Sequence, residues 1–169
     1  MADYTSLAIN DFRSYLWEQL KANNVLLEND YYADGFIQPL IPIIPSQQIP
    51  EFNNLLPGKS YIVYESEIMP MEEQWWITHE MINLMIVSPD YDQINKIMNL
   101  LVDLFRRYDL STTDLKQSNI LSNNFLFHYT AINRVKSPQP MKQEGGLRVG
   151  NISILLCYSR KVSTDGRFE

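Results

Sequence analysis

Apolar residues change their spacing twice along this chain, and the change limits the folds open to it. Over 61–68 and 75–87, β-branched and aromatic residues interspersed with polar ones predict two strands. Over 91–108, apolar residues recur three or four positions apart, which predicts an amphipathic helix. Strand patterns return over 125–133 and 149–159. Two strands, a helix and two more strands predict a sheet with a helix packed against it.

An earlier helix is predicted over 4–23, because apolar residues recur there on one helical face. With this helix, the order of elements predicts an α+β domain: a mainly antiparallel sheet of four or more strands with two helices packed on it. The length of 169 residues fits one domain, which we assign to residues 1–160. The polar residues 161–169 predict a flexible tail.

Three segments connect these elements in unusual ways. Residues 36–57 form a proline-rich arm, and Pro39 and Pro45 argue against a central strand because proline lacks the N–H that a sheet needs. An extended edge segment suits the arm better. Residues 136–148 predict a long loop, of a length that is usually functional or mobile. Ser88 precedes a proline and an aspartate, and it is the expected N-cap of the second helix.

The sequence shows little catalytic chemistry, and it predicts no catalytic residue, cofactor or metal site. His79 lacks the second histidine of a zinc-protease helix, and His128 reads as a core or surface residue. Cys157 is expected to act as a small apolar residue of the last strand. Glu65 and Glu67 share a strand face. They predict a solvated acidic edge, with a weak cation site as the alternative.

Two features indicate the compartment in which the chain folds. It has one cysteine, so no intrachain disulfide forms. The N-terminus has no signal-peptide pattern, and no apolar run is long enough to predict a membrane-spanning helix. We expect the chain to fold in a reducing cytoplasm.

Charge is distributed unevenly along the sequence. Residues 1–95 carry 3 basic and 14 acidic residues, whereas residues 130–169 carry 7 basic and 3 acidic ones. The formal net charge of −6 argues against a protein that grips nucleic acid through a basic face. An acidic half and a basic end make one copy complementary to the next, and such head-to-tail contacts generate rings. The alternative is that the basic loops fold back onto the acidic half of the same copy.

Two groups of residues are candidates for contact with a second subunit or another protein. The first is a predicted hairpin tip whose apolar side chains need a cover, unless they form the base of the core; it comprises Met69, Met71, Trp75 and Trp76. The second is a set of basic residues near the C-terminal end, namely Lys136, Lys142, Arg148, Arg160 and Lys161.

The layout and several local patterns resemble a known family. Residues 55–64 (LLPGKSYIVY), the tryptophan-containing second strand and Ser88-Pro89-Asp90 at the start of a helix carry the resemblance. They are similar to tail terminator (tail completion) proteins of tailed bacteriophages, and most of all to the small neck proteins of contractile-tailed phages. The resemblance covers roughly residues 4–160.

The resemblance implies a structural protein of the virion without enzymatic activity. It implies a homohexameric ring that caps the head-proximal end of the tail tube, stops tube polymerisation and joins the tail to the neck. The implied partners are copies of the chain itself, the tail tube protein, the neck connector and, in contractile tails, the sheath. Assembly would take place in the host cytoplasm, and no membrane is involved. DNA would cross the lumen without sequence-specific binding.

Two alternatives stay open at this stage. One is another neck, head-completion (stopper) or baseplate protein of the same virion. The other is a small enzyme or ligand-binding domain that uses His79 or His128.

Overall fold

The computed structural model describes residues 6–33, 36–40, 43–46, 60–69, 77–112, 114–140 and 146–161. These ranges contain two helices, α1 (Ser6–Ala22) and α3 (Tyr91–Phe105). Their strands are β1 (Leu26–Ala33), β2 (Phe36–Leu40), β3 (Ile43–Pro45), β4 (Tyr61–Met69), β5 (Ile77–Ser88), β6 (Phe125–Pro140) and β7 (Arg148–Arg160).

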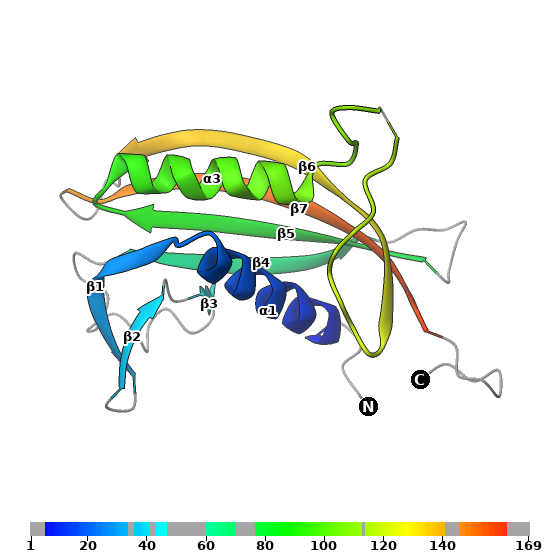
Figure 1. The fold of residues 1–169 in the computed structure, drawn as a ribbon, viewed down its shortest axis with the longest axis horizontal. Helices are drawn as coiled ribbons and strands as arrows, with labels where there is room; N and C mark the ends of the chain where they lie inside the picture. The colour runs from blue at the N-terminus through cyan, green and yellow to red at the C-terminus, as the bar shows by residue number, and fades with distance from the viewer. Residues whose placement is uncertain are drawn as a thin grey trace.

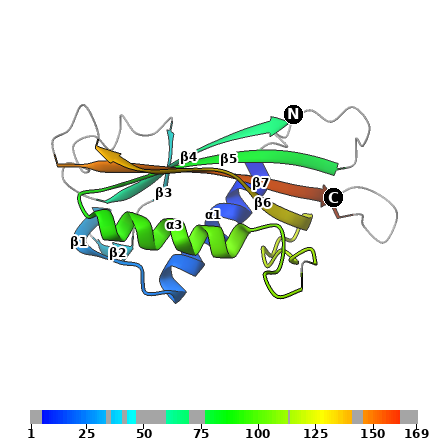
Figure 2. The ribbon, with the colours of Figure 1, turned by 90° about the horizontal axis from the view of Figure 1, so that it is seen from above.

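Five of the strands form one sheet in the order β3-β4-β5-β7-β6 (Figure 1). All neighbouring pairs are antiparallel except β3 and β4, which are parallel. Figure 2 shows α3 lying along one face of this sheet, and α1 packs on the same core. The predicted fold class, a mostly antiparallel α+β domain with two helices, is therefore confirmed.

The main core lies between the helices and one face of the sheet. Even-numbered residues of β5 and β7 point into it, because alternate side chains of a strand point to opposite faces. Phe12 of α1 meets Phe105 of α3 with ring centroids 5.2 Å apart, so the helices also pack on each other. The buried residues at the centre of this core include Leu16, Ile82, Leu84, Ile97, Leu101, Ile154 and Leu156.

The proline-rich arm contributes strands where prolines are tolerated. β3 is the edge strand of the main sheet, and β2 pairs only with β1 in a separate two-stranded sheet. A strand in either position forms ladder hydrogen bonds on one side only. It can therefore contain a proline, which has no N–H to donate. Sequence analysis did not predict β1, whose polar and charged residues match no strand pattern. Residues 41–42 and 47–57 of the arm lie outside the described ranges.

Two predicted boundaries differ from the structure. β6 continues to Pro140, so residues 136–140 belong to a strand and the connection between β6 and β7 is shorter than the predicted loop over 136–148. Prolines are accommodated there because β6 is an edge strand with irregular register between Lys136 and Gln139. Helix α3 ends at Phe105 rather than at Tyr108, because the backbone of Arg106 is already extended.

The N-cap of α3 is Asp90, and the prediction of Ser88 was wrong. The Asp90 carboxylate accepts a hydrogen bond of 2.9 Å from the backbone N–H of Asp92. Ser88 is instead the last residue of β5 and is fully buried. Its hydroxyl accepts from the Asp90 N–H at 3.0 Å and contacts Ser60 and Gln93, so it ties the helix start to the sheet.

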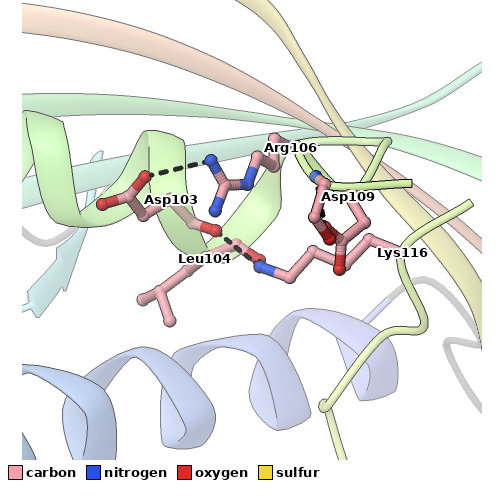
Figure 3. A network of polar contacts seen from close by, with 6 residues as sticks. Asp103, Leu104, Arg106, Asp109 and Lys116 are labelled. Atoms are coloured by element: carbon pink, nitrogen blue, oxygen red, sulfur yellow. Dashed lines mark hydrogen bonds and ion pairs between the residues drawn. The ribbon is translucent and has the colours of Figure 1, made fainter. Parts of the chain in front are cut away.

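The connection from α3 to β6 is held against the end of the helix (Figure 3). Lys116 Nζ donates to the carbonyls of Asp103 and Leu104 at 2.5 and 3.2 Å. A cation at a helix C-terminus stabilises carbonyls that have no partner within the helix. The backbone of Asp109 pairs with that of Asp114 at 2.9 Å, which closes a short turn between them. The connection is thus an ordered part of the fold.

Candidate functional site

The face of the sheet that points away from α1 and α3 carries the exposed polar groups, and we call it the distal face. It contains the odd-numbered residues of β4, β5 and β7, because their even-numbered neighbours point into the helix-covered core. In β6 a register irregularity after Ile132 brings Arg134 and Lys136 onto this face, opposite Ser153 and Asn151.

A row of polar side chains crosses the distal face at right angles to the strands. Glu65 of β4 pairs with Asn83 of β5, Asn83 with Ser153 of β7, and Ser153 with Arg134 of β6. The Ser153 hydroxyl donates a hydrogen bond of 2.6 Å to the Asn83 side chain. These four residues form the polar row. Since neighbouring strands lie about 4.8 Å apart, the backbones of Glu65 and Arg134, at the two ends of the row, are roughly 14 Å apart.

A shallow groove of about 460 Å³ lies over the polar row and the row beside it. The neighbouring row contributes Val63, Met85, Asn151 and Lys136, so one side of the groove is basic. Its other side is lined by Glu65. The groove therefore has a negative side, at the Glu65 carboxylate, and a positive side, at Arg134 and Lys136.

The charged groups of this face are exposed and lie apart from opposite charges in the part of the chain that the structure describes. Glu65 and Glu67 on β4 are exposed, as are Arg134 and Lys136 on β6. Within the described ranges, none of these four side chains has an ion-pair partner. β5 and β7 lie between the acidic strand and the basic strand, and no ion pair joins the two strands in the described chain. Among the described residues, the basic strand therefore does not fold back on the acidic one.

A second cluster lies further along the same face, where Met69, His79, Cys157 and Tyr129 face one another across four strands. His79 Nε2 and the Tyr129 hydroxyl are 3.2 Å apart. The Arg107 guanidinium lies 4.7 Å from the centre of the Tyr129 ring, within the range of a cation–π contact. His79 is 9% exposed, and its Nδ1 atom has no hydrogen-bond partner among the described residues.

In this cluster His79 and Cys157 are paired across β5 and β7, and the Tyr129 hydroxyl of β6 is hydrogen-bonded to both side chains. Burial raises the pKa of the Cys157 thiol, so the neutral form is favoured at pH 7. Burial lowers the pKa of His79, which favours the neutral imidazole. In the described part of the chain, no three histidine, cysteine or acidic side chains lie close enough together to hold a metal ion.

The predicted basic contact residues occupy separate places in the fold. Lys136 is exposed on β6, beside the groove. Arg148 begins β7, with its guanidinium 5.4 Å from the centre of the Tyr91 ring of α3. Arg160 and Lys161 lie at the other end of β7, where Lys161 Nζ donates to the Ser122 carbonyl at 2.6 Å. Of the four predicted basic residues that the structure describes, Lys136 is the one that lies on the distal face beside Arg134.

The predicted hairpin tip is described only in part. Met69 is the last residue of β4 and is 43% exposed on the distal face, next to His79. Met71, Trp75, Trp76 and Lys142 lie outside the described residues. His128 is exposed, and its Nε2 atom is 2.9 Å from the Ser159 hydroxyl.

Sequence analysis did not name Arg134 as a contact residue and did not connect it with Glu65. The predicted strand ended at Asn133, and a loop was expected from Lys136, so the face on which Arg134 lies was not determined. The register irregularity after Ile132 decides that face. A single extra residue reverses the alternation, and local sequence patterns do not reveal it.

A comparison with protein-family models finds no match, and a comparison with curated proteins finds none either. Neither described helix is long and apolar enough to cross a membrane.

Proposed function

We propose that this protein is a structural component of a phage virion, a ring that caps the head-proximal end of a tail tube. In this role it stops tube polymerisation and joins the tail to the neck connector. The observation that carries the proposal is the exposed charge on the two sides of the distal face, acidic on β4 and basic on β6, with no ion-pair partner among the described residues. Each copy is then complementary to a neighbour placed beside it in a head-to-tail arrangement.

Other features support a structural role rather than a chemical one. The residue types that could act as nucleophile and base are present in the His79 cluster, but burial favours the neutral Cys157 thiol over the thiolate. The net charge of −6 on each copy gives an acidic ring, which repels phosphates and lets DNA slide through a lumen. The hexameric stoichiometry comes from the resemblance to tail terminators.

The first test measures self-association. Light scattering of the purified protein should give a mass near six times the 19.8 kDa monomer, and negative-stain images should show rings. Arg134→Glu should weaken association at least tenfold, because it replaces an attraction between subunits with a repulsion. Lys96→Glu is the matched control, since Lys96 is exposed on α3, on the other side of the sheet, and undergoes the same charge change.

The second test measures capping. Added to polymerising tail tube protein, the chain should shorten the tubes and label one end of each. A neck or head-completion (stopper) protein of the same virion would bind the connector and leave tube length unchanged. Unlabelled tubes of unchanged length, with a monomeric protein in solution, would overturn the proposal.

A further inference from the structure

Besides the outer edge of the three-residue strand β3, two strand edges of the main sheet have no partner strand among the described residues. One is the outer edge of β6, the last strand of the sheet. The other is the second half of β4, because β3 pairs only with Ile62, Val63 and Tyr64 and leaves Glu65–Met69 uncovered in the described chain. Unpaired edges present rows of N–H and C=O groups that can pair with another chain.

The direction of the strands allows these two edges to meet between copies. β4 is antiparallel to β5, β5 to β7, and β7 to β6, so β4 and β6 run in opposite directions. In a ring of copies related by rotation, the β6 edge of one copy approaches the β4 edge of the next as an antiparallel pair.

A single register of this strand pair places each acidic residue of the β4 edge opposite a basic residue of the β6 edge. If Glu67 lies opposite Arg134 in an antiparallel pair, Glu65 lies opposite Lys136, because residue numbers increase in opposite directions along the two strands. All four side chains lie on the distal face of their own sheet, so both pairs would share one face of the joined sheet. Opposite charges directly across a strand pair stabilise the pairing.

The same register avoids the prolines of β6. Pro138 and Pro140 follow the register irregularity after Lys136, so they lie outside the stretch of β6 that would pair with Glu65–Glu67. No intersubunit hydrogen bond is therefore needed where proline has no N–H to donate. The contact is limited to Arg134–Lys136 against Glu65–Glu67, between the register irregularities of β6 that follow Ile132 and Lys136.

From these observations we propose that the acidic edge of β4 in one copy pairs with the basic edge of β6 in the next, with Glu67 opposite Arg134 and Glu65 opposite Lys136. Two β6 edges, or two β4 edges, would bring like charges together and repel each other. The charges thus exclude symmetric edge pairing and select the head-to-tail contact. This pairing rests on the ring proposed above and names the contact that closes it.

Disulfide trapping tests the register directly. A chain with Glu67→Cys and Arg134→Cys should give a ladder of crosslinked multimers in a non-reducing gel, because the two positions meet between copies. The matched control is Glu67→Cys with Val135→Cys, since Val135 lies on the opposite face of β6, opposite Ile152 of the core. The native Cys157 is buried and should not crosslink in the unmodified chain.

The outcomes separate this contact from the ring itself. The register is supported if the fraction of chain in crosslinked bands is at least tenfold higher for the Glu67→Cys, Arg134→Cys chain than for the Glu67→Cys, Val135→Cys control. If light scattering shows oligomers but the two cysteine pairs crosslink equally or not at all, the edge contact is wrong and the ring proposal still holds. Monomers without crosslinks overturn both. The charge swap Glu67→Arg with Arg134→Glu should restore the association that each single change removes, and failure to restore it counts against this register.

Discussion

Glu80 is the residue whose environment departs most from that of its sequence neighbours. It is fully buried on the core face of β5, while the adjacent His79 lies on the distal face. The Tyr158 hydroxyl donates to its Oε2 atom at 2.7 Å, but its Oε1 atom has no hydrogen-bond partner among the described residues. Burial raises the pKa of Glu80 above the ordinary 4.5, and the hydrogen bonds from Tyr158 and Ser66 offset only part of this rise.

Glu80→Gln should therefore change how stability depends on pH. Between pH 4.5 and the raised pKa, the unfolded chain releases a proton that the folded chain retains, so wild-type stability falls as pH rises. Each unit between the two pKa values costs about 1.4 kcal/mol. The free energy of unfolding of the variant minus that of the wild type should increase from pH 4 to pH 8, as measured by urea titration. A difference independent of pH would show that Glu80 titrates alike in both states.

At the scale of elements, helix α3 and strand β7 approach each other most closely at Gly150. A Cβ atom at this position would lie 2.6 Å from Met98 Sδ and 2.8 Å from Ile94 Cγ2. Both distances are well inside van der Waals contact, and Ile94 is fully buried. The absence of a side chain in β7 thus sets the distance between the helix and the sheet.

Gly150→Ala should destabilise the protein by about 1–3 kcal/mol, because inserting a methyl group into a packed core displaces its neighbours. Urea or thermal unfolding measures the loss. Asn151→Ala is the control, since Asn151 is the next residue of the same strand and points into the groove on the distal face. Equal stability of the two variants would mean that the α3–β7 contact has room for the added carbon.

At the scale of the whole molecule, the fold places opposite charges on the two sides of one sheet face. The acidic residues come from the first half of the chain and the basic ones from the last third. The order β4-β5-β7-β6 keeps them apart within a copy and leaves both available to neighbours.

Association of the copies should weaken as salt is added. The screening length falls from about 10 Å at 0.1 M salt to about 3 Å at 1 M, so exposed charge pairs lose most of their attraction. The mean mass in light scattering should decrease over this range, and the Arg134→Glu variant should respond less than the wild type. A mass that is constant or rises with salt would show that apolar contacts, rather than these charges, hold the copies together.

The sequence by itself determined the class of fold and the kind of each long element. The periods of apolar residues depend on neighbours two, three or four positions away, so β4, β5, β7 and both helices could be predicted from local patterns. The short strands of the arm and the polar strand β1 could not, since their pairing partners, rather than their composition, make them strands.

Only the tertiary structure decided which charged residues share a face. Arg134 joins Glu65 in one row because β6 has an irregular register after Ile132 and because β5 and β7 lie between the two strands. Both facts depend on pairing between residues far apart in the chain, and a shift of one residue would have turned Arg134 into the core. The sequence shows that acidic and basic residues are segregated along the chain. Strand order and register decide that the acidic ones lie on β4 and the basic ones on β6, on the same face of the sheet.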